Sequence, residues 1–229
     1  MYKDSQGNLK GVAIDILNDF VEYAKTTYKA ELQVRFIEES AFDKFLGRVS
    51  KTENVLGVSS VSITDERKKV LKFTPTFLTN PNVIITHTSA PKLNDLNDLS
   101  TIFGDFKVKV VKGSIHDSYA KDLKSKYNPA LVIEYANSSR AIFREMTHDS
   151  KLFTIIDFGE YLGAFRSKLQ LVRQNVDLGL IDNMGFIMHK SSDWNVVWDQ
   201  FLTDEYRSST RYRKIISDNL GSVYLALIK

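Results

Sequence analysis

Strand-like and helix-like patterns alternate along this chain, and this alternation limits its fold more than any other feature. Apolar residues recur at helical spacing from Gly11, and alternating apolar residues at 32–37 predict a strand. Helical spacing returns at 42–49, and residues 54–59 predict a second strand. Such β/α alternation favours a parallel sheet flanked by helices.

The alternation starts again after the segment PNVIITHTSAP at 81–91, which has a proline at each end. Further strands are predicted at 107–111, 131–134, 152–157, 169–174 and 185–190. Ser114 and Asp117 resemble a capping box at the start of one helix, and the pair Ser138 and Ser139 is expected to cap another. An apolar stripe follows the last strand, at Trp194, Val197, Trp198 and Phe201.

The two runs of alternation predict an α/β protein of two lobes with a ligand cleft between them. Lobe 1 is expected at 1–86 plus 184–229, and lobe 2 at 91–174. The hinge segments are expected at about 82–91 and 180–188. The chain would then cross twice between the lobes, which makes lobe 1 discontinuous in sequence.

Composition and missing motifs exclude several classes of function. The 31 basic and 28 acidic residues are interspersed, whereas a nucleic-acid surface needs its basic residues gathered on one face. The chain has no cysteine, and His87, His116, His148 and His189 are scattered, so no metal site is predicted. Neither glycine-rich nucleotide-binding motif occurs, and no cofactor is expected. No stretch approaches the roughly 20 apolar residues of a membrane span.

The hydroxyl-rich stretch SSVSITDERKKV at 59–70 has two interpretations. It can be a turn followed by a capped helix with a solvated basic side, which needs no function. It can also be an anion site, in which Thr64 caps a short helix and Arg67 lies in its first turn. An arginine there would present a planar fork that suits a carboxylate. The residues alone leave both interpretations open.

This stretch and others resemble the extracellular solute-binding proteins of family 3, which serve polar amino acid ABC importers. The similarity runs over nearly the whole chain. KDSQGNLKGVAIDIL is similar to the family's opening, in which Asp15 matches the second acid of a motif and Ala13 departs from the first. SAFDKFLGRVSKTENVLGVSSVSITDER is similar, without gaps, to the family's segment that leads into S-I-T-x-x-R.

The resemblance implies a type II periplasmic-binding-protein-like fold and a set of ligand-binding residues in lobe 1. Arg67 would bind the α-carboxylate of an amino acid, with help from Ser62. The backbone of Ser60 would lie near the α-ammonium, and Phe42 would cover the ligand side chain.

In lobe 2, VVKGSIHDSYA and FTIIDFGEYL resemble two further family motifs. They imply that Ser114 and Ile115 offer backbone N–H groups to the carboxylate and that Asp157 binds the ammonium. Ile115 departs from the family's hydroxyl residue, and His116 lies where a glutamine is common. Asp157 also has an interpretation without a ligand, as a helix N-cap after a strand.

The resemblance further implies an exported protein at the periplasmic or extracellular face of the membrane, with a signal peptide in its precursor. The family's first strand would lie just before Met1, so it is missing here. The expected partners are a small-molecule ligand and an ABC permease or a receptor, without nucleic acid, and a monomer is expected.

Other functions remain open at this point. The same fold can be the ligand-sensing domain of a larger membrane receptor or enzyme. It can carry dehydratase-type chemistry if His116 or Glu160 acts as a general acid. It can also be a regulatory module whose pocket has decayed, as Ala13 and Ile115 would allow.

Overall fold

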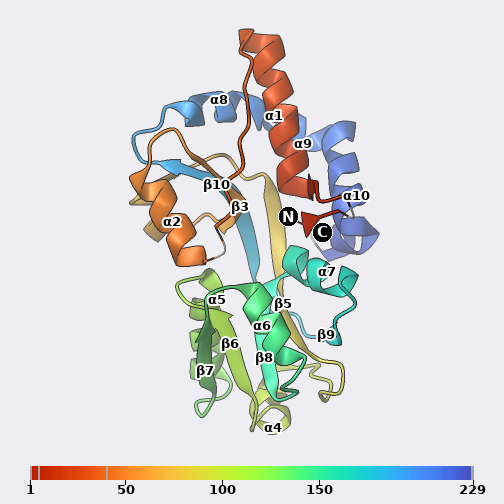
Figure 1. Ribbon diagram of the computed structural model, residues 1–229. Helices are drawn as coiled ribbons and strands as arrows, with labels where there is room; N and C mark the ends of the chain where they lie inside the picture. The colour runs from red at the N-terminus through yellow and green to blue at the C-terminus, as the bar shows by residue number, and fades with distance from the viewer. Residues whose placement is uncertain (1, 5, 40, 228–229) are drawn as a thin grey trace. The chain divides into compact units, whose positions relative to one another are not determined.

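A computed structural model describes residues 2–4, 6–39 and 41–227 of the protein (Figure 1). The chain divides into two compact units. Unit 1 comprises Met1–Glu39, Phe45–Thr79 and Asp182–Lys229, and unit 2 comprises Ser40–Lys44 and Asn80–Ile181. Two strands, β5 (Leu78–His87) and β10 (Ile181–His189), carry the chain from unit 1 to unit 2 and back. The lobe and hinge boundaries inferred from the sequence stay predictions.

Unit 1 combines short strands with the longest helices of the described chain. Its remaining strands are β1 (Tyr2–Lys3), β2 (Leu9–Lys10), β3 (Leu56–Ser62) and β4 (Leu71–Phe73). Its helices are α1 (Val12–Tyr28), most of α2 (Phe42–Lys51), α3 (Asp65–Lys68), α8 (Trp194–Phe201), α9 (Asp204–Ser208) and α10 (Thr210–Leu227).

Strand β10 organises the sheet of unit 1, because both β3 and β4 pair with it in antiparallel register. Ile187 of β10 lies opposite Gly57 of β3, and helix α2 packs on the same place through Val49. A Cβ atom at Gly57 would lie 2.5 Å from Cγ1 of Ile187 and 2.9 Å from Cγ2 of Val49. Only glycine therefore fits at this crossing without movement of its neighbours.

Helix α1 packs against α8 through aromatic rings. Phe20 of α1 stacks on Trp198, with 3.7 Å between ring centroids, and it also meets Phe201 edge-on. Trp198 and Phe201 are buried, as the apolar stripe predicts, whereas Trp194 at the start of α8 is exposed. The stripe therefore covers the core only in its last turn.

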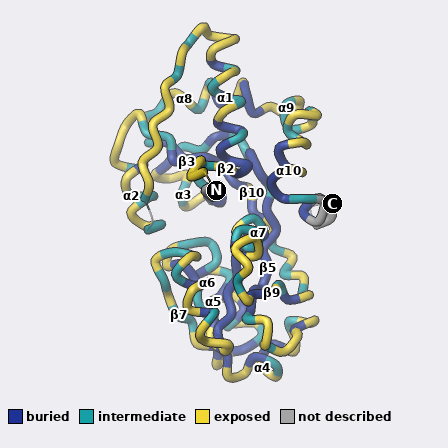
Figure 2. Tube along the Cα trace, turned by 45° about the vertical axis from the view of Figure 1, so that its right-hand side comes forward, coloured by how far each residue is buried: buried dark blue, intermediate teal, exposed yellow. Residues whose placement is uncertain are grey.

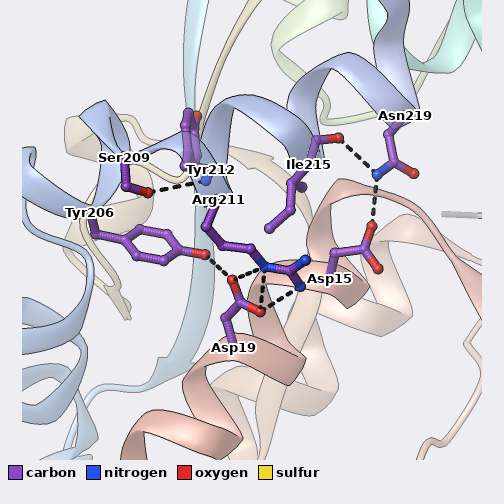
Figure 3. Close-up of polar contacts among 8 residues, drawn as sticks. All are labelled: Asp15, Asp19, Tyr206, Ser209, Arg211, Tyr212, Ile215 and Asn219. Carbon is purple, nitrogen blue, oxygen red and sulfur yellow. Dashed lines mark hydrogen bonds and ion pairs between the residues drawn. The ribbon is translucent and has the colours of Figure 1, made fainter.

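A polar network joins α1 to α9 and α10 (Figure 3). Arg211 donates hydrogen bonds to both carboxylate oxygens of Asp19, and the Tyr206 hydroxyl donates to the same carboxylate over 2.8 Å. The amide of Asn219 donates to Asp15 over 2.7 Å. The C-terminal helices are thus held to α1 by charge-assisted bonds as well as by apolar packing.

Unit 2 contains a mixed sheet with helices between its strands. Its strands, besides β5, are β6 (Lys107–Val111), β7 (Val132–Ala136), β8 (Leu152–Asp157) and β9 (Leu171–Arg173). Its helices are a short 3-10 turn (Leu96–Asp98), α4 (Leu99–Ile102), α5 (Ile115–Lys126), α6 (Ser139–Met146) and α7 (Phe158–Arg166).

The central strands of unit 2 set where its polar side chains meet. Strand β6 pairs in parallel with β7 and β8, whereas β5 pairs antiparallel with β8 and β9. Because β6, β7 and β8 are parallel, the starts of α5, α6 and α7 lie at the same edge of the sheet. The core of unit 2 consists of buried apolar side chains, of which Ile84, Phe103, Val108 and Phe153 are fully buried.

Two expectations about secondary structure are wrong. The strand expected at 32–37 is absent, because residues 29–39 form no regular structure between α1 and α2. The parallel sheet that the alternation favours is also wrong for most of the described strands, since only β6 pairs in parallel there, with β7 and β8. Apolar alternation predicts which face of a strand is apolar, but it does not predict which strand pairs with it or in which direction.

Among the described residues, none of the helices combines the length and apolar character that crossing a bilayer requires.

Candidate functional site

In unit 1, the end of β3 leads directly into α3, as the hydroxyl-rich stretch predicts. The Thr64 side chain accepts a hydrogen bond of 3.2 Å from the Arg67 backbone N–H, so the predicted helix cap is confirmed. Asp65 and Glu66 occupy the first turn, where acidic side chains favour the positive end of the helix.

Arg67 differs from the two lysines that follow it. Its Nη1 donates a hydrogen bond of 2.9 Å to the Ser62 carbonyl oxygen, which holds the half-buried guanidinium against the end of β3. Lys68 and Lys69 are exposed and form ion pairs along the helix surface, of 3.6 Å with Asp65 and 2.6 Å with Glu66. The three basic residues are therefore not one solvated side of a helix.

A buried carboxylate lies beside Ser62. The Ser62 hydroxyl is 3.4 Å from a carboxylate oxygen of Asp182, and both residues are buried. They meet because Ser62 lies opposite Met184 in the antiparallel pair of β3 and β10. Ser60 lies two residues earlier on β3 and is half-buried. We call Ser60, Ser62, Arg67 and Asp182 the Arg67 cluster.

In unit 2, Asp157 ends β8 and caps α7. Its Oδ1 accepts hydrogen bonds from the Glu160 backbone N–H at 3.0 Å and from the Asn80 side-chain amide at 2.7 Å. The Asn80 amide oxygen in turn accepts from the Gly159 backbone N–H. The N-cap interpretation of Asp157 is therefore confirmed, and its role toward a ligand stays a proposal.

The environment of Asp157 disfavours a negative charge on its carboxyl. Burial raises the pKa of Asp157 to about 7, and the nearby Glu160 carboxylate adds to the rise. The hydrogen bonds from Glu160 N–H and Asn80 oppose the shift but do not cancel it. A cation brought to this carboxyl would favour its ionised form.

Glu160 and Ser139 complete the polar group at the starts of α6 and α7. The Ser139 hydroxyl donates to a Glu160 carboxylate oxygen over 2.5 Å. Ser138 caps α6, since its hydroxyl accepts from the Ala141 backbone N–H at 3.3 Å, as predicted. We call Asn80, Ser139, Asp157 and Glu160 the Asp157 cluster.

The start of α5 differs from its prediction. The capping box is wrong, because the Ser114 hydroxyl donates to the Val111 carbonyl oxygen at 2.7 Å and caps nothing. Asp117 instead pairs with Lys121 at 3.0 Å. Ile115 is the first residue of the helix, and backbone N–H groups in this turn have no partner within the helix itself.

His116 lies in the first turn of α5, and its Nε2 is 2.9 Å from the Asn82 amide oxygen. Asn82 lies opposite Asp157 in the pair of β5 and β8, so His116 is positioned from the same strand that holds the Asp157 cluster. Phe42 is half-buried at the first position of α2 and is grouped with unit 2.

Three residues of these clusters, Asn80, Ser139 and Asp182, were not predicted from the sequence, and neither was Asn82, which lies against His116. The two asparagines flank Pro81 in a strand that is buried over most of its length, and buried polar residues there were an available signal. The sequence around Asp182 and Ser139 does not indicate a site, because each meets its partner only in the folded chain. Asp182 reaches Ser62 through the pairing of β10 with β3, and Ser139 reaches Glu160 at the start of α7. In the described part of the chain, no group of three or more histidine, aspartate and glutamate residues could hold a metal ion.

Comparison with known proteins agrees with this architecture. Residues 1–220 match the family model for bacterial extracellular solute-binding proteins, family 3. An ancestral arginine-binding protein bound to glutamine shares 19% sequence identity, with a TM-score of 0.76 over 96% of this chain and 92% of that one.

Two further solved structures are similar at 22% identity. One is an ancestral amino acid-binding protein that is a precursor of cyclohexadienyl dehydratase, with a TM-score of 0.75 over 96% of this chain and 89% of that one. The other is an amino acid ABC transporter substrate-binding protein from Streptococcus pneumoniae bound to L-arginine, with a TM-score of 0.73 over 97% and 89%. The likeness confirms the predicted α/β, type II periplasmic-binding-protein-like fold.

Proposed function

Because the chain belongs to the bacterial extracellular solute-binding proteins of family 3, we propose that it binds a polar amino acid and delivers it to an ABC importer. The bound amino acids of its structural neighbours, glutamine and L-arginine, support this class of ligand. In this proposal the protein works at the periplasmic or extracellular face of the membrane, as a monomer with a permease partner.

The observation that carries the proposal is a basic and an acidic side chain at two strand ends, one in each unit. Arg67 follows β3 in unit 1, and Asp157 ends β8 in unit 2. An amino acid zwitterion carries one carboxylate and one ammonium. We assign its carboxylate to Arg67, assisted by Ser62 and the start of α5, and its ammonium to Asp157 and the Ser60 backbone.

Such a ligand would have to engage both units at once, so binding would favour a closed arrangement. We place the hinge in the two strands that connect the units, β5 and β10. Phe42 and His116 would then lie against the ligand side chain and set its size and polarity.

We propose binding without chemistry. The two candidate general acids have structural partners of their own, since His116 contacts Asn82 and Glu160 accepts from Ser139. A dehydratase would need one of these groups positioned against a leaving group. Product analysis after incubation with bound ligands separates this alternative, because a binding protein returns the ligand unchanged.

A thermal-shift screen of the common amino acids and small dicarboxylates tests the proposal. A ligand at 100 times its Kd stabilises the folded state by about 2.7 kcal/mol, which is a shift of several degrees. We expect at least one polar amino acid to give this shift and dicarboxylates without an ammonium group to give none. A flat response to every amino acid would instead support a decayed pocket.

Ligand affinity should depend on pH through Asp157. With a pKa of about 7, its carboxyl is protonated below neutrality in the free protein, while an ammonium ligand requires the ionised form. Affinity should therefore be full above pH 7 and fall by up to about tenfold per pH unit below it. Calorimetry between pH 5 and 8, in buffers of different ionisation enthalpy, should show proton release on binding.

Two variants assign this pH dependence. Asp157→Asn should bind more weakly at pH 8 and lose the dependence, because the amide does not titrate. His116→Gln should keep it, since that substitution leaves Asp157 in place. If the wild-type affinity is flat over this range, or if His116→Gln rather than Asp157→Asn abolishes the slope, Asp157 is not the group that meets the ammonium.

A further inference from the structure

Asn80 is a fully buried polar side chain that bonds to the carboxyl assigned to the ligand ammonium. It lies in β5, which Figure 2 shows mostly in the buried colour. A buried amide needs partners for its donor and its acceptor, because each unpaired group costs stability. The Asn80 Nδ2 donates to Asp157 Oδ1 over 2.7 Å, and its Oδ1 accepts from the Gly159 N–H over 3.3 Å. Both partners of the amide therefore belong to the start of α7.

These two partners fix the orientation of the Asn80 amide. An ionised carboxylate only accepts hydrogen bonds and a backbone N–H only donates them, so the reversed amide would meet two mismatched partners. The bond to Gly159 supports the start of α7. The bond to Asp157 instead acts on a group of the candidate site, and neither leucine nor alanine could make it.

The two oxygens of the Asp157 carboxyl have different surroundings. Within the described chain, both of its hydrogen bonds are accepted at Oδ1, from Asn80 and from the Glu160 backbone N–H at 3.0 Å. Two donors on one oxygen hold the plane of the carboxyl and leave Oδ2 to accept from a ligand ammonium. The same two bonds favour the ionised form, against the burial that raises the pKa of Asp157 to about 7.

Two other titratable side chains lie near this carboxyl among the described residues. Glu160, on α7, accepts from Ser139 of α6, and its charge raises the pKa of Asp157 further. His116, on α5, contacts Asn82 of β5. Their side chains meet Ser139 and Asn82 rather than the Asp157 oxygens, so Asn80 is the side chain there that donates to Asp157 directly.

We propose that Asn80 is a positioning residue of the amino acid site, whose amide holds the Asp157 carboxylate in the orientation and charge state that an ammonium ligand needs. This inference rests on the proposed function, because it assumes that Asp157 meets the ammonium. Asn80 itself acts through Asp157 and not through the ligand. Replacing it should therefore change the pH range over which the ligand binds, and not only the strength of binding.

The wild-type protein tests the contact without a ligand. The Asp157 carboxyl carbon, identified by its absence in Asp157→Asn, should titrate near pH 7 in NMR spectra. The side-chain amide protons of Asn80 should titrate with the same midpoint, because their hydrogen bond strengthens when its acceptor is charged. Asn80 amide protons that do not titrate in this range, or that still titrate in Asp157→Asn, would overturn the proposal.

Asn80→Leu removes the donor while a side chain of similar size keeps water out of its place. The Asp157 midpoint should rise by about 1–2 pH units, which is the size of a hydrogen bond to a charged group. Ligand affinity follows the ionised fraction of Asp157. Its loss relative to the wild type should therefore be about 10- to 100-fold at pH 6 and about 2- to 10-fold at pH 8. A merely structural loss would be the same factor at both pH values.

Gln174→Leu is the matched control, because Gln174 is also a buried amide of unit 2. It accepts from the Leu93 N–H and donates to the Thr86 hydroxyl oxygen, both outside the Asp157 cluster. This variant should lower the melting temperature, as Asn80→Leu does, but leave the Asp157 midpoint at its wild-type value. A midpoint that moves equally in the two variants would overturn the proposal.

The outcomes separate this inference from the proposed function. If amino acids bind and Asn80→Leu weakens them by the same factor at pH 6 and pH 8, Asn80 is structural and the proposed function stands. If no amino acid binds the wild type while Asn80→Leu still moves the Asp157 midpoint, the proposed ligand is wrong, whereas the control of Asp157 by Asn80 is supported.

Discussion

Replacing Arg67 with alanine is expected to reduce amino acid affinity by about one and a half to three and a half decades. We assign Arg67 to the ligand carboxylate, and losing one member of a desolvated charge pair costs about 2–5 kcal/mol. A ligand of micromolar affinity would then escape detection by calorimetry. Arg67→Lys should recover only part of the loss, because an ammonium cannot reproduce a two-pronged contact.

Lys68→Ala and Lys69→Ala are the controls for this experiment. Both side chains are exposed and pair with acids on the surface of α3, so removing either should change affinity only a few-fold. The Arg67 side chain also bonds to the Ser62 carbonyl oxygen, so the melting temperature of Arg67→Ala must be measured as well. An unchanged melting temperature assigns the loss of affinity to the lost ligand contact. Equal, small losses at all three positions would return this stretch to an ordinary capped helix.

Replacing Trp198 with alanine is expected to destabilise unit 1 by about 3–5 kcal/mol. The indole is fully buried, stacks on Phe20 and meets Phe186 at 5.4 Å between ring centroids. Its removal leaves a cavity between α1, α8 and β10 that these rigid elements cannot fill. Urea unfolding followed by circular dichroism should show the loss as a lower midpoint.

Trp198→Phe separates ring packing from the polar atom. Within the described chain, the buried Trp198 Nε1 has no hydrogen-bond partner, so phenylalanine removes an unsatisfied donor while keeping a ring against Phe20. We expect this variant to lose much less stability than Trp198→Ala. If the two variants were equally unstable, the aromatic stack would not be the source of the stability.

The parts of the fold that the sequence predicts well are those with local causes. Strands β6 and β8 have the predicted bounds, and the caps at Thr64 and Ser138 are made by the residues expected. In each case the residues that define the strand or the cap lie within a few positions of one another in the sequence. Strand β5 was expected only as an extended connection, because its asparagines and Pro81 interrupt the strand pattern.

The candidate site divides in the same way. Arg67 and Asp157 could be proposed from the sequence because each belongs to a short motif at a strand end. Asp182 was not found, because only the pairing of β10 with β3 brings it to Ser62, 120 residues away in sequence. The prediction of a Ser114 cap is wrong because the Ser114 hydroxyl donates to the Val111 carbonyl oxygen instead. The spacing of residues in the sequence does not predict this bond.

The route of the chain through β5 and β10 has a mechanical consequence. Both ends of the described chain lie in unit 1, and residues 80–181 of unit 2 are inserted between two parts of it. A tensile force applied at Tyr2 and Leu227 is therefore carried by unit 1 as long as that unit is folded. Unit 2 comes under load only after unit 1 has ruptured, so the order of mechanical unfolding is imposed by connectivity and not by the relative strength of the two units.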